Sequence, residues 1–392
     1  MRDDCLRLFR AGLDRADPVR ATEAHLPEAA PAAILALGKA AIPMARAALS
    51  RFPGVPATVV TNPENAAALP GATVLLGAHP VPDAASARAG AALLEAAAAA
   101  EGRVLALISG GGSALAVAPV EGVTWADKAA VSDLLLGAGL DIGAMNVVRR
   151  ACSRLKGGGL ARAARHGLDA LILSDVVGDD PQAIASGPTV APTTGAAEAR
   201  AVLRGAGLWA RVPPSVRAAL ARPDPAPPPA AGWTLVGSNA LSVEAMAAAA
   251  PGAAVARPLT GDVADAARRV AAAARGGPGT TLWGGETTVV LRGGGTGGRN
   301  QELALRVALL LEGFGRPWAF LSGGTDGRDG PTDAAGAVVD GGTLARMRAR
   351  GIDPAARLGD NDSHPALAAS GDLLVTGGTG TNVADLQVLR VG

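Results

Sequence analysis

Short continuous runs of apolar residues alternate with longer amphipathic stretches along the chain. Runs of this length are typical of strands that are covered on both faces, and the stretches between them have helical spacing. In the first part of the chain we expect strands at residues 32–38, 57–61, 73–78, 103–109 and 168–176. Helices are expected from residue 39, after Asp83, at 124–137 and at 141–155. This alternation predicts an α/β fold with a mainly parallel sheet.

The pattern is interrupted at residues 221–232, ARPDPAPPPAAG, where five of twelve residues are proline. Such a segment forms neither a helix nor a central strand, so we interpret it as a semi-rigid linker between domains at 1–230 and 231–392. Further strands are expected at residues 233–238, 253–258, 282–286, 287–293, 318–324 and 373–378. Two α/β domains in tandem predict a ligand site in the cleft between them. The pattern leaves open which domain takes the last strand, 385–391.

Composition and charge narrow the range of partners. The net charge is +1, which argues against nucleic acid as a ligand. The Ala-rich stretch at 89–100 is too short and too weakly apolar to cross a bilayer, so no membrane partner is expected. Cys5 and Cys152 have no metal-ligand spacing and are typical of thiols in a reducing cytoplasm, and the four histidines form no recognisable zinc pair.

Glycine is the compositional outlier, with 53 residues that cluster at the ends of predicted strands. In open α/β sheets, ligands bind beyond the carboxyl ends of the strands, where glycine lets the backbone approach them closely. SGGGSA at 109–114 is the strongest phosphate candidate, because consecutive amides and two hydroxyls follow a strand directly. It is neither a Walker A loop nor a nicotinamide fingerprint. The predicted nucleotide- or phosphate-binding residues are Gly38, Ser109, Gly110, Gly111, Gly112, Ser113, Lys156, Ser238, Asn239, Thr381 and Asn382.

Only three of the 36 basic residues are lysine, which draws attention to each of them. Lys39 follows a strand at the start of a predicted helix, where a cation opposes the helix dipole and an anionic ligand would explain it. Lys156 precedes three glycines at a predicted helix C-terminus, so a capping role and a ligand role both stay open. Lys128 is expected on a solvated helix face.

Charged residues at other strand ends extend the candidate site. Asp175 lies at the end of the strand expected at 168–176, and Glu286 ends the strand at 282–286; carboxylates in such places suit Mg²⁺ on phosphate oxygens, although Asx-turn capping is an alternative. Arg299 begins a predicted helix and is a natural bidentate clamp for carboxylate or phosphate. Amides, isolated cations and carboxylates together favour phosphoryl transfer, which needs alignment and charge neutralisation more than covalent chemistry.

The sequence also resembles, nearly end to end, the glycerate 2-kinases whose C-terminal region is called the MOFRL domain. The resemblance rests on LALGKAA (35–41), SGGGSAL (109–115), NVVRRACSRLKGGGLA (146–161), LSDVVGDDPQAIASGPT (173–189), GGETTVVLRGGGTGGRNQELAL (284–305), GTDGRDGPTDAAGAVVD (324–340) and GTGTNVADLQVLRV (378–391). It implies a Rossmann-like domain followed by a smaller α/β domain. The implied reaction is ATP-dependent phosphorylation of D-glycerate to 2-phosphoglycerate with Mg²⁺ or another divalent cation.

The resemblance also implies residue roles. The essential lysine and arginine proposed for the family match Lys39, which would neutralise the transferring phosphoryl group, and Arg299, which would hold the carboxylate or stabilise the transition state. Our own assignment adds that Asp326 or Asp333 would accept the proton of the substrate hydroxyl and that Asp175 and Glu286, from their places at strand ends, are the metal candidates. The chain departs from the family at Ala151-Cys152, where His-Leu is usual, and at DSHPALAAS (362–370), which usually has an aromatic residue.

Two other functions remain alternatives at this point. One is an NAD(P)H-dependent hydroxypyruvate reductase, against which the missing nicotinamide fingerprint argues. The other is a non-catalytic binder of a small phosphorylated acid, against which the carboxylates beside the anion loops argue. The sequence leaves open the oligomeric state, with a homodimer as one option, and the preferences for enantiomer and nucleotide.

Overall fold

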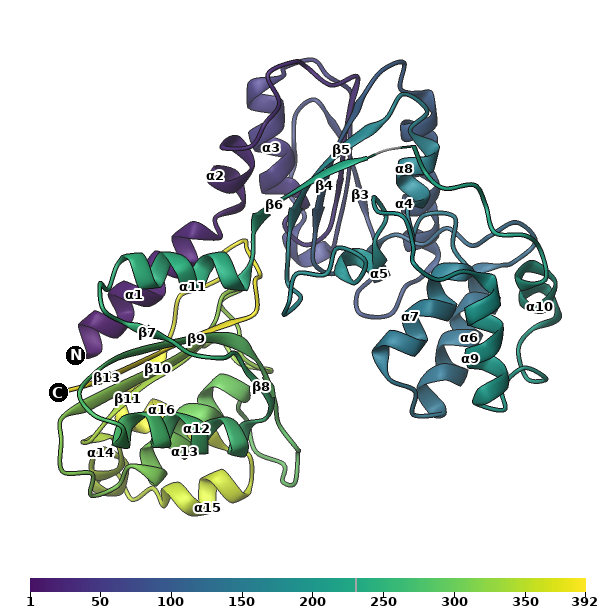
Figure 1. Cartoon of the computed structure of the whole chain (residues 1–392). Helices are drawn as coiled ribbons and strands as arrows, with labels where there is room; N and C mark the ends of the chain where they lie inside the picture. Colours follow the sequence, from purple (N-terminus) through teal and green to yellow (C-terminus); the bar gives the residue numbers. More distant parts are fainter. Residues whose placement is uncertain (230) are drawn as a thin grey trace. The chain divides into compact units, whose positions relative to one another are not determined.

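In a computed structural model, which describes residues 1–229 and 231–392, the chain forms two compact units (Figure 1). The first unit consists of residues 18–174 and 179–236. The second consists of residues 1–17, 175–178 and 237–392. Residue 230, the predicted end of the first domain, lies outside the described residues.

The predicted domains, 1–230 and 231–392, need correction at the N-terminus. Helix α1 (Arg2–Arg15) belongs to the second unit, because its apolar face packs on the sheet of that unit. Leu8 and Phe9 are buried in one cluster with Leu321 and Leu386. Arg2 adds ion pairs to Asp340 and Asp372 of the same unit.

The predicted boundary also needs correction after the proline-rich segment. The chain returns to the first sheet as strand β6 (Gly232–Gly237), next to β5 (Leu168–Leu173), before it enters the second unit. The proline-rich segment is therefore a loop that precedes the edge strand of the first unit.

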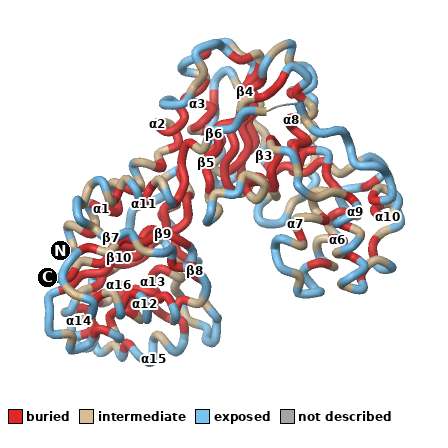
Figure 2. Tube along the Cα trace, viewed as in Figure 1, coloured by how far each residue is buried: buried red, intermediate tan, exposed pale blue. Residues whose placement is uncertain are grey.

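The first unit is built on a six-stranded sheet whose central strands, β1 and β4, are apolar except for Ser109 at the end of β4. The order is β3 (Ala72–Leu76), β2 (Ala57–Thr61), β1 (Ala33–Leu37), β4 (Val104–Ser109), β5 and β6. The pairs β3–β2, β2–β1, β1–β4 and β4–β5 are parallel, as expected. Every residue of β1 and β4 is buried, which explains their unbroken hydrophobic runs (Figure 2).

Helices complete the first unit. They are α2 (Pro18–Glu23), α3 (Ala41–Arg51), α4 (Ala84–Ala99), α5 (Gly112–Leu115), α6 (Trp125–Gly137), α7 (Ile142–Ala151), α8 (Gly159–Ala163), α9 (Ala196–Gly205) and α10 (Pro214–Leu220), with 3-10 turns η1 (Pro63–Asn65) and η2 (Ile184–Ser186). Helices α6, α7, α9 and α10 gather around a core of their own (Figure 1). The helix expected at 141–155 ends at Ala151, because the following residues turn toward α8.

The second unit has a seven-stranded mixed sheet. Its order is β12 (Leu373–Leu374), β11 (Gly336–Asp340), β10 (Trp318–Gly324), β13 (Asp385–Val391), β9 (Gly279–Thr288) and β7 (Ala254–Val255), with β8 (Leu259–Asp262) also paired to β9. The last strand, β13, lies between β10 and β9 and is antiparallel to both. The final strand therefore belongs to the second unit, which answers a question that the sequence left open.

Helices cover both faces of this second sheet. Figure 1 shows α1 and α11 (Asn239–Ala248) on one face, and α12 (Val263–Arg275), α13 (Arg299–Leu310) and α16 (Ser363–Ser370) on the other. Helices α14 (Thr343–Ala349) and α15 (Pro354–Gly359) pack beside α16. The strand expected at 287–293 is wrong beyond Thr288, because the backbone there binds a loop instead. The N–H groups of Arg292 and Gly293 both donate to Oδ1 of Asn361.

Lys128 is buried rather than solvated, which corrects the expectation for α6. Its side chain is 7% exposed, and Nζ donates to the carbonyl oxygens of Arg149 (3.0 Å) and Cys152 (3.2 Å). These carbonyls end α7 and have no partner within the helix. Lys128 therefore caps α7 from a neighbouring helix.

We expect Lys128 to make the free energy of unfolding change with pH in the alkaline range. Burial lowers the pKa of Lys128 from 10.5 to about 8. At pH values between these two pKa values, the unfolded chain binds more protons than the folded one. The free energy of unfolding therefore rises with pH, by at most roughly 1.4 kcal/mol for each pH unit. Urea unfolding at pH 7.5 to 10 should show this rise in the wild type relative to Lys128→Met. Parallel curves for the two proteins would contradict the assignment.

Candidate functional site

The ends of strands β1 and β4 bring the first group of predicted residues together. These strands are parallel neighbours, with Leu37 opposite Ile108. The N–H of Lys39 donates to the carbonyl of Gly110 (2.9 Å), and the N–H of Ala40 donates to Oγ of Ser109 (3.1 Å). Gly38 has φ +134°, and a side chain there would collide with Ser109. The two glycine-rich loops are thus joined by hydrogen bonds.

The side chain of Lys39 lies over the loop after β4. A Cβ atom placed on Gly111 would be 3.1 Å from Cγ of Lys39 and 3.5 Å from Cδ2 of His79. Lys39 is partly exposed and makes no ion pair with any described residue. It precedes α3, whose N-cap is Ala40, instead of starting the helix. Lys39 therefore offers a charge that an anionic ligand can neutralise.

His79 is a neighbour of Lys39 that sequence reasoning missed. Burial, followed by the charge of Lys39, lowers the pKa of His79. The pKa of Glu64 is lowered chiefly by its own backbone N–H and the Asn62 side chain, with smaller contributions from His79 and Lys39. The sequence carried one signal for His79, its place shortly after the end of β3.

Lys156 lies in the turn between α7 and α8, so it does not cap α7; the C-cap of that helix is Cys152. Its side chain is only 4% exposed. Burial, followed by the charges of Lys128 and Arg149, lowers its pKa well below the usual value. The next residue, Gly157, donates its N–H to the carbonyl of Ser186 (3.1 Å), and the hydroxyl of Ser186 lies 2.6 Å from that of Ser113.

The second group of predicted residues surrounds Arg299 in the second unit. Arg299 begins α13, Glu286 lies in β9, and Asp385 begins β13. Nε and Nη2 of Arg299 donate to Oδ2 and Oδ1 of Asp385 (2.7 and 2.8 Å), and Nη1 lies 2.9 Å from Oε1 of Glu286. Burial lowers the pKa of Arg299, but the hydrogen bond and charge of Asp385 and the charge of Glu286 raise it above its usual value. The guanidinium is therefore already paired with carboxylates.

Several carboxylates accumulate beside this arginine. The pKa of Glu286 is raised by burial; Arg299 lowers it, and the charges of Asp385, Asp175 and Asp326 raise it. The described residues nevertheless contain no group of three or more His, Cys, Asp or Glu side chains arranged to hold a metal by themselves. Excess negative charge still suits a cation, since Mg²⁺ on a nucleotide needs only one or two protein carboxylates.

The remaining acids differ in their surroundings. Asp329, which the sequence placed in no role, is buried and accepts the N–H groups of Asn300 (3.0 Å) and Gln301 (2.8 Å) at the start of α13. Burial raises its pKa to about 6, although these N–H groups oppose the rise. Asp333 is 84% exposed, and its only described ionic neighbour is His364, at 3.7 Å. The structure thus places Asp326, but not Asp333, among the carboxylates whose charges act on Glu286 beside Arg299.

Four predicted phosphate ligands bind their own chain instead. Ser238 caps α11 through the N–H of Leu241, and Thr381 donates to the carbonyl of Ala16 (2.7 Å). Asn239 donates to the carbonyls of Val383 and Asp385, which helps to fix β13, and Asn382 accepts the N–H of Ala384. Their polar atoms are used within the second unit, so a phosphate role for them stays a prediction without structural support.

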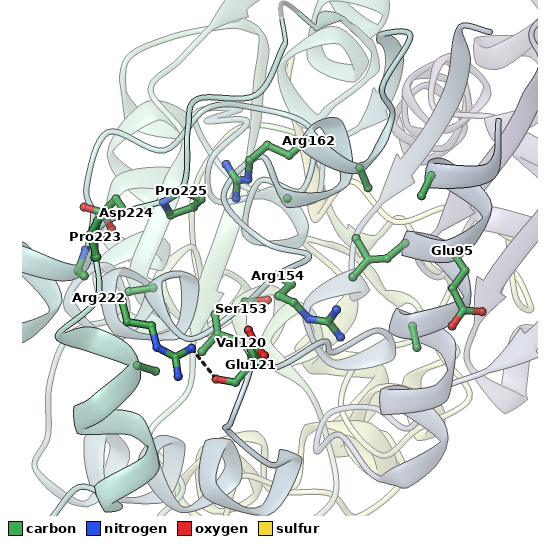
Figure 3. Close-up of a pocket in the computed structure, with 18 residues that line it drawn as sticks. Glu95, Val120, Glu121, Ser153, Arg154, Arg162, Arg222, Pro223, Asp224 and Pro225 are labelled. Carbon is green, nitrogen blue, oxygen red and sulfur yellow. Dashed lines mark hydrogen bonds between the residues drawn. The ribbon is translucent and has the colours of Figure 1, made fainter. Parts of the chain in front are cut away.

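The first unit also contains a cavity of about 680 Å³, and none of the predicted ligand residues is among those that line it (Figure 3). Arg154, Arg162 and Arg222 line it, and Arg222 donates to the carbonyl of Glu121 (3.0 Å). Three acids, Glu95, Glu121 and Asp224, balance these charges. The mixed charge gives no preference for one class of ligand.

None of the described helices combines the length and apolar character that a membrane span requires.

Comparison with known proteins places this architecture in a class. Residues 4–221 match the family described as a domain of unknown function, DUF4147, and residues 279–385 match the MOFRL family. The chain is therefore a two-domain α/β protein of the DUF4147–MOFRL class. A glycerate 2-kinase from Pyrococcus horikoshii is 38% identical over 91% of this chain and 87% of its own. A relative from Agrobacterium vitis, provisionally named a hydroxypyruvate reductase, is 41% identical over 98% of this chain and 93% of its own.

A solved structure agrees with these relatives. The crystal structure of a glycerate kinase from Thermotoga maritima has a TM-score of 0.93 and 34% identity, and the match covers 100% of this chain and 99% of that one. The chain belongs to the MOFRL-type glycerate 2-kinase family.

Proposed function

We propose that this protein transfers a phosphoryl group from ATP to the 2-hydroxyl of D-glycerate, giving 2-phosphoglycerate and ADP. The observation that carries the proposal is Lys39, a partly exposed cation without a described ion pair, held over the glycine-rich loop after β4. Such a cation beside amide groups suits a transferring phosphoryl group. The glycerate kinases from Pyrococcus and Thermotoga support the same activity.

The residues divide into roles under this proposal. Lys39 and the loop at 109–112 would hold and neutralise the phosphoryl group. Asp326 would accept the proton of the substrate hydroxyl, a role that suits it better than the exposed Asp333. Arg299, fixed by Asp385 and Glu286, would stabilise charge in the transition state. That the two groups serve one site between the domains stays a prediction.

A divalent cation such as Mg²⁺ would neutralise the nucleotide phosphates. Asp175 and Glu286 are the residues that would hold it, because the charge of Asp175 acts on Glu286 and helps to raise its pKa. We therefore expect EDTA to abolish turnover and added Mg²⁺ to restore it.

One assay tests the proposal directly. The purified protein is incubated with ATP, MgCl₂ and D-glycerate, and the product is resolved by ³¹P NMR as 2- or 3-phosphoglycerate. L-Glycerate in a parallel reaction gives the enantiomer preference. Appearance of 3-phosphoglycerate, or of no phosphorylated acid, would exclude the proposed reaction.

The name given to the Agrobacterium relative makes hydroxypyruvate reduction a second candidate. Absorbance at 340 nm, followed with hydroxypyruvate and NADH or NADPH in the absence of ATP, separates the two reactions. We expect no oxidation of the nicotinamide, since no nicotinamide fingerprint is present in the sequence. We also propose a cytoplasmic location, supported by Cys5 and Cys152, which are both buried and unpaired.

A further inference from the structure

The N-terminus of helix α13 is capped by a residue from outside the helix. Its N-cap residue, Gly298, has no side chain, and the carboxylate of Asp329 accepts the first free N–H groups instead. The N–H of Asn300 donates to Oδ1 of Asp329 (3.0 Å), and the N–H of Gln301 donates to Oδ2 (2.8 Å). An N-cap side chain usually accepts one such N–H group from its own helix. Asp329 accepts two, from a loop that lies 29 residues beyond Asn300.

Close packing explains why α13 carries no cap of its own. A Cβ atom on Gly298 would lie 2.2 Å from Cγ of Asp329 and 2.4 Å from its carbonyl carbon. Gly330, which follows Asp329, has φ +62°, and a Cβ atom there would lie 2.2 Å from the carbonyl oxygen of Gly297. Only glycine fits at both places. The loop that holds Asp329 therefore packs directly on the backbone that leads into α13.

The side chains of the first helical residues bind the same loop. Nε2 of Gln301 donates to the carbonyl oxygen of Asp329 (3.2 Å) and to Oγ1 of Thr332 (2.9 Å). Oδ1 of Asn300 accepts the hydroxyl of Ser322 in β10, the strand that precedes the loop (2.5 Å). Asn300, Gln301 and Asp329 are all buried. The start of α13 is thus fixed by partners that solvent does not reach.

This cap acts on Arg299, the first residue of α13. A cation at a helix N-terminus opposes the helix dipole, and the carboxylate of Asp329 places a compensating negative charge at the same end. The charge of Asp329 also raises the pKa of Arg299, after the stronger effects of burial, Asp385 and Glu286. Asp385 and Glu286 hold the guanidinium, whereas Asp329 holds the next two backbone N–H groups. Arg299 is therefore fixed at both its side chain and its backbone.

The loop of Asp329 also carries Asp326, the residue proposed to accept the substrate proton. Oδ1 of Asp326 accepts the N–H of Arg328 (3.0 Å), and the next residue is Asp329. The charge of Asp326 acts on Glu286, which contacts Arg299. Asp329 thus joins the loop that carries Asp326 to the helix start that carries Arg299.

The ionised carboxylate at this place is unfavourable for stability. Burial raises the pKa of Asp329 to about 6; the two N–H groups lower it, Asp385 raises it and Arg299 lowers it. An acid whose pKa is higher in the folded chain than in the unfolded chain destabilises the fold at pH values above both. An uncharged side chain of the same shape would avoid this cost. Retention of a carboxylate here therefore favours a role in the reaction over a role in stability.

We infer that Asp329 is a positioning residue that fixes Arg299 relative to Asp326 for phosphoryl transfer. The inference rests on the proposed function and adds to it a residue that acts through the backbone of Asn300 and Gln301 instead of touching the substrate.

Asp329→Asn tests the inference, because it keeps the shape and one acceptor oxygen but removes the charge. We expect kcat with D-glycerate and ATP to fall about 10²-fold, since a misplacement of about 1 Å costs this much. KM for both substrates should change less than about threefold, because the variant alters alignment and not binding. The free energy of unfolding in urea at pH 8 should be no lower than that of the wild type.

Asp353→Asn is the matched control. Asp353 caps α15 by accepting the N–H groups of Ala355 (2.9 Å) and Ala356 (3.2 Å), but it is exposed and lies on another helix. We expect this variant to lose stability and to keep the kcat of the wild type. A folded Asp329→Asn protein with wild-type kcat would overturn the inference. So would a loss of activity no larger than the loss of folded protein, because that is the result for a purely structural cap.

A double-mutant cycle tests the link to Arg299 without the reaction. Arg299→Met should lower the free energy of unfolding less in the Asp329→Asn background than in the wild type, and equally in the Asp353→Asn background. Arg299→Lys serves in the cycle if Arg299→Met does not fold. Additivity in both cycles would reject the positioning role, whatever the activity. Coupling in a protein that makes no 2-phosphoglycerate would reject the proposed reaction and keep the link between Asp329 and Arg299.

Discussion

Lys39→Met is expected to lower kcat by about 10³-fold while the protein stays as stable as the wild type. The lysine makes no ion pair with a described residue and is partly exposed, so its removal breaks no folded-state contact of that kind. A single cation that neutralises a transferring phosphoryl group contributes an effect of this order. The measurement is steady-state kinetics with D-glycerate and ATP, together with thermal unfolding.

Two further variants define what Lys39 supplies. Lys39→Arg keeps the charge but must place a wider, planar group where Cγ of Lys39 lies 3.1 Å from the position of a Cβ on Gly111. We expect kcat of the Lys39→Arg protein to exceed that of the Lys39→Met protein by less than about tenfold. Arg46→Met removes an exposed cation from α3 and should leave kcat unchanged. Normal turnover by a folded Lys39→Met protein would remove the central role assigned to this residue.

Arg299→Met is expected to abolish activity and, unlike Lys39→Met, to destabilise the second unit. Asp385 is fully buried, and Arg299 is its bidentate partner. Loss of the arginine leaves an uncompensated buried carboxylate, which costs about 3–5 kcal/mol of unfolding free energy. Chemical denaturation measures the loss, and kinetic assays measure the activity.

The matched control is the pair formed by Arg103 and Asp169 in the first unit. It has the same bidentate geometry, at 2.5 Å for both contacts, but the side chains are 52% and 44% exposed. Arg103→Met should therefore cost less than about 1 kcal/mol and leave activity intact. The double variant Arg299→Met/Asp385→Leu should regain stability without regaining activity. If Arg299→Met lowers the free energy of unfolding no more than Arg103→Met does, burial does not strengthen the Arg299–Asp385 pair.

The sequence allowed the first half of the site to be predicted because its signal is local. Gly38 and Gly110 to Gly112 each follow a buried strand directly, and the carboxyl ends of parallel strands meet at one edge of a sheet. Arg299 was recognisable as a cation at a helix start, but its partner Asp385 lies 86 residues away in sequence, on a strand whose sheet the pattern left open.

The errors in the prediction concern features that are set by packing between segments distant in sequence, as the Arg299–Asp385 pair is. The pattern of α6 placed Lys128 on a polar face, but helical spacing gives no information about the free carbonyls at the end of α7. The local sequence of α1 likewise gives no information about which sheet covers its apolar face. The Ser113–Ser186 contact joins residues 73 apart, so it too was visible only in the structure.

The scarcity of lysine makes Lys39 chemically addressable. Of the three lysines, Lys128 and Lys156 are buried, which leaves Lys39 as the partly exposed side-chain amine. An acylating reagent or a lysine-specific protease acting on the folded protein would therefore react there, apart from the α-amino group at Met1. If bound nucleotide slows the acylation of Lys39, mass spectrometry of the modified protein would report how far nucleotide occupies the loop after β4.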